Sequence, residues 1–216
     1  VLNNRELTVS PVLGFFGFYE FISNFGEFYK NLQFQYLWNK IYLARIIKKY
    51  ELRFDETTKR GEDILFNLDY LNHCKSIFII DNPLYYYNHY NLNSLTMSYN
   101  KNLFEDQQRI FKKVRLFLKN HDQYESNKTV IERLYINRVI SCFDNLFASN
   151  NDLTKNDKII EISRLINHED VRKSLKYYKG RGIKWIILKL MIKYKVPKVI
   201  YFFYKLKYMI RKNWNL

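Results

Sequence analysis

The sequence predicts an α/β chain in which a small sheet is followed by a mainly helical C-terminal region. Apolar residues recur at helical spacing over long stretches, which indicates amphipathic helices. One short run of apolar and β-branched residues, bounded by polar ones, indicates a strand. The 216 residues include only Gly 6 and Pro 3, and 47% are hydrophobic, so the chain can bury a substantial core and is not of the disordered class.

The N-terminal part begins with an expected amphipathic helix over residues 15–29. Its apolar stripe is Phe18, Phe21, Ile22, Phe25, Phe28 and Tyr29. We interpret the stripe as core packing, because apolar stripes on helices usually face the core, with a ligand-stacking surface as the alternative. The second half of residues 37–52 is expected to form a short helix. Its inward-facing residues are Leu43, Ile46 and Ile47.

Residues 53–90 are expected to supply the sheet. A brief extended piece and a polar loop, residues 53–61, precede a helix over 62–75. The apolar face of that helix is Ile64, Leu65, Leu68 and Leu71. Residues 76–80 are a continuous apolar run, which predicts a buried strand. The aromatic run at 84–90 predicts a second strand, so these two runs are expected to form the small sheet.

Helical patterns dominate after residue 100. Three helices are expected at 103–119, 127–148 and 155–167. Beyond them, Pro197 should end or kink any helix, because proline lacks the backbone N–H that a helix interior needs.

The charge of the chain is concentrated at its C-terminus. The net charge is +15, and residues 171–216 hold 14 Lys and Arg with no Asp or Glu. The rest of the chain holds 22 of the 36 basic residues against all 21 acidic ones, so it is nearly neutral. Cys74 and Cys142 are too few for a disulfide framework, and we interpret them as small buried hydrophobes in a reducing compartment.

Five short motifs follow one another between residues 38 and 96. They are WNKIY (38–42), RFDE (53–56), GEDILFN (61–67), IIDNPLYYY (79–87) and NSLT (93–96). The series resembles the second half of bacterial family 2 glycosyltransferases of the GT-A type, which build capsule, exopolysaccharide, lipopolysaccharide and teichoic-type glycans. The combination is specific, whereas any one motif is not. The resemblance covers residues 15–100 well and the later helices only loosely.

The resemblance implies a partial GT-A-like fold in three parts. Residues 1–100 would be the acceptor side of the catalytic domain, 101–170 a helical bundle, and 171–216 a basic amphipathic tail. The tail is expected to lie on an anionic membrane surface, because its lysines are interleaved with apolar side chains. Packing on the body of the protein or on a partner subunit is the alternative.

The same resemblance implies Asp63 as the catalytic base, with Glu62 as its neighbour. A sugar hydroxyl is a poor nucleophile until a base takes its proton in the transition state, and one carboxylate suffices for inverting transfer. Taken alone, the acidic pair has a simpler interpretation, because carboxylates stabilise helix N-termini.

Five further residues are candidates for substrate binding. They are Trp38, Asn39, Lys40, Arg60 and His89. Lys40 and Arg60 could meet a leaving diphosphate or an acceptor phosphate, and solvated charges are the alternative. Trp38 could pack on a sugar or serve as a structural aromatic. His89 follows the YYY run, where the family often has a basic residue.

The donor side of such an enzyme is not expected in this chain. The resembled family binds its divalent metal, Mn or Mg, and the donor diphosphate with an Asp-x-Asp triplet upstream of the W-N-K motif, and no such triplet occurs here. No metal site is expected in the chain itself, which alone should be inactive. The expected function is glycosyl transfer from a nucleotide sugar to a glycan or lipid-linked acceptor, in the cytoplasm at the inner face of the plasma membrane.

Two other classes of function compete with this hypothesis. The basic charge and the interleaved aromatics would suit a helical nucleic-acid-binding module. The charge is confined to the tail, however, and no nucleic-acid-binding motif occurs, so no nucleic-acid partner is expected. A membrane-surface scaffold without catalysis is the third possibility.

Overall fold

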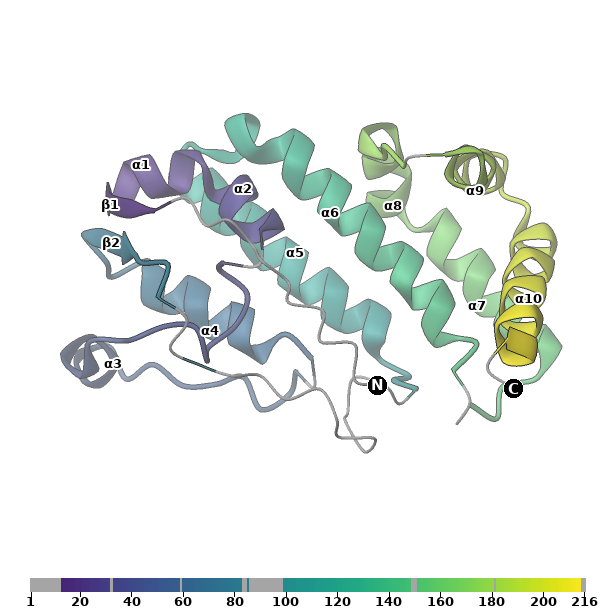
Figure 1. The fold of residues 1–216 in the computed structure, drawn as a ribbon, viewed down its shortest axis with the longest axis horizontal. Coiled ribbons are helices and arrows are strands. Elements are labelled where there is room, and N and C mark those ends of the chain that lie inside the picture. The colour runs from purple at the N-terminus through teal and green to yellow at the C-terminus, as the bar shows by residue number, and fades with distance from the viewer. Residues whose placement is uncertain are drawn as a thin grey trace. The chain divides into compact units, whose positions relative to one another are not determined.

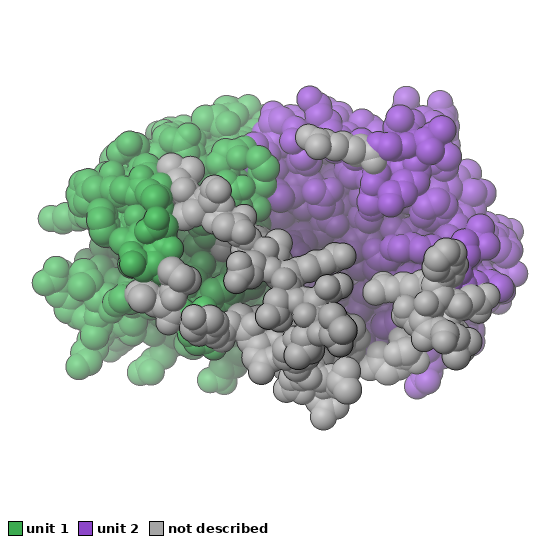
Figure 2. Space-filling model, in the orientation of Figure 1, with its two compact units in different colours: residues 1–87, 112–128 green, residues 88–111, 129–216 purple. Residues whose placement is uncertain are grey.

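A computed structural model describes most of the chain. The described residues are 13–31, 33–58, 60–82, 85, 99–148, 151–180 and 182–214. The chain divides into two compact units (Figure 2). Unit 1 comprises residues 1–87 and 112–128, and unit 2 comprises 88–111 and 129–216. The three-part division expected from the sequence stays a prediction.

The sheet of unit 1 joins two segments far apart in the sequence (Figure 1). β1 (Gly14–Gly17) pairs antiparallel with β2 (Ser76–Ile79), with Gly14 opposite Ile79. The strand expected at 76–80 is therefore confirmed, but the expectation that it is buried is wrong. Phe78 is 69% exposed, because a two-stranded sheet has no second layer over its outer face. The partner expected at 84–90 lies outside the described residues apart from Tyr85.

The expected fold class holds at the coarse level of a mainly helical chain with a small sheet. The described residues do not form a GT-A fold. A parallel sheet needs a crossover that returns each strand in the same direction. Here the connection between β1 and β2 brings the chain back in the opposite direction.

Four short helices accompany the sheet in unit 1. They are α1 (Phe18–Ser23), α2 (Phe25–Lys30), α3 (Ala44–Lys49) and α4 (Glu62–Leu71). The helix expected over 15–29 is interrupted at Asn24 and starts late, since its first residues belong to β1. Its stripe packs in the core, as expected: the Phe21 and Phe28 rings stack with centroids 4.3 Å apart.

The inward orientation expected for α3 is wrong. None of its residues is buried, and the preceding Leu43 is 51% exposed. The helix has 6 residues, which is less than two turns and too few to present a continuous apolar stripe to a core.

Residues 112–128 belong to unit 1 because they complete its core. Phe117 lies with its ring centroid 5.8 Å from that of Phe25. Asn127 is buried, accepts a hydrogen bond from the Gly26 N–H at 2.6 Å, and donates one to the Ile22 carbonyl at 3.0 Å. Its amide therefore gives the buried Gly26 N–H a partner at the junction of α1 and α2, and adds a second donor to the Ile22 carbonyl.

Helices form all the regular structure described in unit 2, and two of them begin or end in unit 1. The helices of this region are α5 (Leu103–Asn120), α6 (Tyr124–Asn145), α7 (Lys155–Asn167), α8 (Glu169–Ser174), η1 (Leu175–Tyr177), α9 (Ile183–Lys193) and α10 (Pro197–Trp214). The helices expected at 103–119, 127–148 and 155–167 are thus confirmed, to within a few residues. Pro197 does break the helix, as expected, and it is the first residue of α10, where its missing N–H costs nothing.

Contacts of several kinds hold unit 2 together. The Phe111 and Tyr135 rings meet edge to face at 5.3 Å, and Glu132 accepts a hydrogen bond from Ser174 inside the core. Arg164 forms ion pairs with Glu105 and Glu161. Thr154 and Asp157 form a capping box at the start of α7.

Replacing Asn127 with alanine should destabilise unit 1. The Gly26 N–H would remain buried without a partner, which typically costs about 1–3 kcal/mol. Equilibrium urea unfolding measures the change. Asn167→Ala is the matched control, because its amide bonds only to Ser163 at the surface and its loss should cost less than about 0.5 kcal/mol. Equal effects of the two changes would contradict the assigned role of Asn127.

Candidate functional site

The N-terminus of α4 carries the predicted acidic pair. Gly61 has φ +98°, a left-handed conformation that residues with a Cβ rarely adopt, and it precedes the helix directly. Glu62 and Asp63 are the first two residues of α4, and the Ile64 N–H donates to the Gly61 carbonyl at 3.1 Å. The turn at Gly61 thus fixes both carboxylates in the first turn of the helix.

Asn67 attaches the segment 34–42 to the same helix. It is 2% exposed, and its Nδ2 donates to the Phe34 carbonyl at 2.8 Å. Its Oδ1 accepts from the Tyr42 hydroxyl at 2.6 Å. Asn67 and Asp63 are four residues apart and therefore lie on the same face of α4. The attachment brings the W-N-K motif to the side of α4 that carries Asp63.

Asp63 is half-buried and contacts that segment. The backbone N–H of Leu37 donates a hydrogen bond to its carboxylate. Burial and, second, repulsion from Glu62 raise its pKa, whereas the Leu37 hydrogen bond and the Lys40 charge oppose the increase. A carboxylate with a raised pKa holds a proton more firmly, and is a stronger base, than an ordinary aspartate.

Lys40 supplies the cation of the site. Its Nζ donates to the Tyr36 carbonyl at 2.5 Å and to the Asn39 Oδ1 at 2.8 Å. Burial lowers the pKa of Lys40 to about 7, and attraction to Asp63 opposes this decrease. The amine is therefore partly unprotonated at neutral pH, and an arriving anion would favour its charged form.

Trp38 and Asn39 occupy the exposed side of the same segment. The indole of Trp38 stacks on Tyr36 with centroids 5.0 Å apart, and on Tyr85 at 5.4 Å, yet the residue remains 38% exposed. Asn39 is exposed, and its side chain orients the Lys40 amine. Both structural and sugar-contacting roles are open to the indole in this position.

Two of the seven predicted site residues, Lys40 and Asp63, interact across the two segments. Glu62 is the neighbour of Asp63 on α4, and Trp38 and Asn39 directly precede Lys40 in the chain. Arg60 is partly buried and directly precedes Gly61. His89 lies outside the described residues.

Sequence reasoning missed Asn67 and Tyr42 as supporting residues of this site. Both stand inside motifs already singled out, GEDILFN and WNKIY, so their presence in those motifs was the available signal. Burial raises the pKa of Tyr42, and so does the nearby Asp63 charge, so its hydroxyl stays protonated and can keep donating to Asn67.

No metal site is expected in this chain from its sequence, and that expectation stays a prediction. Among the described residues, no group of three or more His, Cys, Asp and Glu side chains could hold a metal ion. The reaction step considered below uses only residues of this chain. Cys142 is buried and Cys74 half-buried, and both are free thiols whose pKa burial raises.

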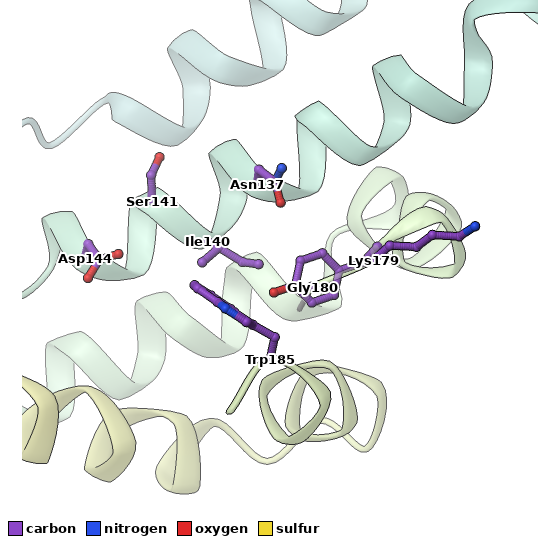
Figure 3. Close-up of a pocket in the computed structure, with 8 residues that line it drawn as sticks. Asn137, Ile140, Ser141, Asp144, Lys179, Gly180 and Trp185 are labelled. Atoms are coloured by element: carbon purple, nitrogen blue, oxygen red, sulfur yellow. The ribbon is translucent and has the colours of Figure 1, made fainter. Parts of the chain in front are cut away.

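A cavity of about 410 Å³ lies in unit 2, and none of the predicted site residues lines it. Residues of α6 form one wall, and Trp185 of α9 reaches toward Ile140 while Lys179 points away (Figure 3). A Cβ on Gly180 would stand 2.3 Å from that of Trp185, so only glycine fits there. Asp144, at the edge of the cavity, already bonds to Lys207 and Tyr208. We therefore interpret the cavity as a packing defect and not as a binding site.

Comparisons with models of protein families, with curated proteins and with solved structures found no match to this chain. The assignment of the site therefore depends on the motif series, on the interactions of Asp63 with Leu37 and Lys40, and on the hydrogen bonds of Asn67 to Phe34 and Tyr42.

Lys40 should titrate near pH 7. Lysines can be reductively methylated with ¹³C-formaldehyde and their methyl signals followed by NMR, with Lys40→Arg used to assign the signal. We expect a midpoint of about 7 because burial disfavours the ammonium form. Asp63→Asn should lower the midpoint further, since it removes the attraction that favours the charge.

The same shift predicts a pH dependence of stability. The folded pKa of Lys40 lies below its unfolded value of 10.5, so the unfolded chain binds more protons between about pH 7 and 10.5. The free energy of unfolding, relative to that of Lys40→Met, should therefore rise with pH across this window. A flat difference, or an NMR midpoint at the ordinary value for lysine, would contradict the burial of this amine.

Proposed function

We propose that this chain is the acceptor side of a family 2 glycosyltransferase with Asp63 as the base. The enzyme transfers a sugar from a nucleotide sugar to a glycan or lipid-linked acceptor in the synthesis of cell-surface polysaccharide, with inversion at the anomeric carbon. The supporting observation is the contact between two of the resembled motifs. Asp63 of the G-E-D motif accepts a hydrogen bond from Leu37 and interacts with Lys40 of the W-N-K motif.

The chemistry of the step assigns a task to each of these residues. As the acceptor hydroxyl oxygen forms its bond to the anomeric carbon, the bond from that carbon to the diphosphate oxygen breaks. The hydroxyl proton passes to Asp63, and the nucleoside diphosphate leaves with the bonding electron pair. The raised pKa of Asp63 favours this proton transfer, because it brings the base closer to the working pH.

The cations are suited to the phosphate groups of the reaction. Lys40 gains a proton most readily when an anion is close, so a diphosphate or an acceptor phosphate would restore its charge. Arg60 lies one residue before Gly61 and presents a guanidinium of the kind that binds phosphate in a bidentate manner. Trp38 stacks on Tyr36 and Tyr85, and the part of its indole that stays exposed could contact a sugar ring.

Donor binding is proposed to depend on residues outside this chain. The chain contains no Asp-x-Asp triplet. The complete enzyme would then combine a GT-A-like donor half, holding Mn or Mg, with the acceptor side described here, and would act in the cytoplasm at the inner face of the plasma membrane. The chain alone would be inactive.

Asp63→Asn in the complete enzyme should lower kcat about 10²–10⁴-fold, because loss of a positioned general base typically costs that much. Donor affinity should change little, since the base contacts the acceptor. Steady-state kinetics with a panel of nucleotide sugars and a lipid-linked acceptor, together with donor titrations, measure both quantities.

Asp69→Asn is the matched control for this change. Asp69 lies on the same helix and pairs with Lys113 at 2.6 Å at the surface, so its loss should leave kcat within a few-fold. Unchanged turnover of Asp63→Asn would remove Asp63 from the role of base.

Calorimetry of the 216-residue chain with uridine, guanosine and thymidine diphosphate sugars should show weak binding or none, with manganese or magnesium present. The reason is the missing triplet. Micromolar affinity would show that the donor site lies within these residues. It would overturn the proposal that donor binding depends on residues outside this chain.

A further inference from the structure

The outward side of α10 is a row of exposed apolar side chains. Successive residues of a helix are rotated by about 100°, so apolar residues three, four and seven apart share one side. The row consists of Val199, Phe202, Leu206, Met209 and Ile210, each 51% to 59% exposed. The buried residues of the same helix are Ile200, Tyr201 and Tyr204. These two sets fall on opposite sides of α10, so the row faces away from the core of unit 2.

The preceding helix α9 repeats this arrangement. Its row consists of Ile183, Ile186, Ile187, Leu190 and the following Tyr194, which are 44% to 76% exposed. Its buried residues are Leu188, Met191 and Ile192. The two helices contact each other and are joined by residues 194–196. Two consecutive helices thus leave large apolar rows uncovered, which is unusual for a surface that faces only water.

The charged residues that the tail itself places beside these rows are all positive. Residues 171–216 contain no acidic residue, and Lys198 and Lys205 are exposed along one edge of the α10 row. Lys193 is exposed at the end of α9. A lysine at the edge of an apolar row can lay its methylene stem along that row and extend its ammonium group toward an anionic surface. The pattern therefore combines apolar burial with attraction to negative charge.

We propose that α9 and α10 dock in the plane of an anionic membrane, with the two apolar rows inserted at the boundary between headgroups and acyl chains. No helix among the described residues is long and apolar enough to cross a membrane. An amphipathic helix lying in the interface buries its apolar side and keeps its cations at the headgroups. A nucleic acid would match the lysines and leave both rows uncovered. Of these two occupants, only the lipid surface matches both features.

Vesicle flotation tests the proposal with the intact 216-residue chain. We expect binding to phosphatidylcholine vesicles that contain phosphatidylglycerol, and much weaker binding to phosphatidylcholine alone. Part of the binding should persist at high salt, because salt screens the lysine attraction and not the apolar insertion. An oligonucleotide titration over the same salt series separates the lipid surface from nucleic acid, whose binding falls steeply with salt.

Two pairs of substitutions separate the apolar and the charged contributions. Phe202→Ser with Leu206→Ser should weaken binding about tenfold or more at every salt concentration. Lys198→Gln with Lys205→Gln should weaken it about tenfold at low salt and little at high salt. The matched control is Leu116→Ser with Ile160→Ser, because both residues are also more than half exposed and lie outside the tail. This control should bind like the unchanged chain.

The outcomes that overturn the proposal are specific. One is a chain that ignores the phosphatidylglycerol vesicles, whether or not it binds oligonucleotides. Another is a Phe202 and Leu206 double variant that binds as well as the control pair. Circular dichroism checks that each variant keeps its helices, and Leu206→Gln alone replaces the double variant if that one unfolds.

Discussion

The amide of Asn67 holds the proposed site together. Asn67 stands four residues after Asp63 on α4 and bonds to the Phe34 carbonyl and the Tyr42 hydroxyl. Those two partners bracket the W-N-K motif, so a single buried side chain fixes both ends of the segment that carries Trp38 and Lys40. Without it, the Leu37 N–H would have no fixed position opposite the Asp63 carboxylate. A buried polar network stabilises a fold only if each of its polar groups has a hydrogen-bond partner. Here both the Nδ2 and the Oδ1 of Asn67 have one.

This arrangement places a carboxylate and an amine where burial disfavours the charge of each. Burial raises the pKa of Asp63 and lowers that of Lys40, and their mutual attraction offsets only part of either effect. A partly buried pair of opposite charges contributes little to the free energy of unfolding, because the cost of removing both charges from water opposes their attraction. Perturbed pairs of this kind occur more often where proton transfer or anion binding is needed. The aromatic core of unit 1, with Phe25 between Phe34 and Phe117, provides the stability that the site lacks.

The sequence pattern correctly predicted those helices that are determined by residues close together in the chain. The helix at 155–167 begins and ends as expected because its capping box and apolar spacing lie within it. The partner of β2 was not foreseen, since residues 14–17 meet it only through tertiary contacts and their aromatics continue the helical spacing of α1. For the candidate site, the motifs identified Asp63 and Lys40, but the role of Asn67 could not be read from them. Its partner, a backbone carbonyl at Phe34, has no side-chain signature.

The two proposals concern different units and are connected by the nature of the acceptor. A lipid-linked sugar is confined to the membrane, so an enzyme attached to that surface meets it at a much higher effective concentration than an enzyme free in solution. Each inserted side chain needs only a weak affinity for lipid to hold the protein at the membrane. The reason is that ten exposed apolar residues in and directly after α9 and in α10 act together with the neighbouring lysines. The carboxylate of Asp63 would act on a hydroxyl that the membrane itself delivers. The membrane proposal and the glycosyltransferase proposal can nevertheless be tested separately, because docking depends on residues 183–210 and proton transfer on residues 34–67.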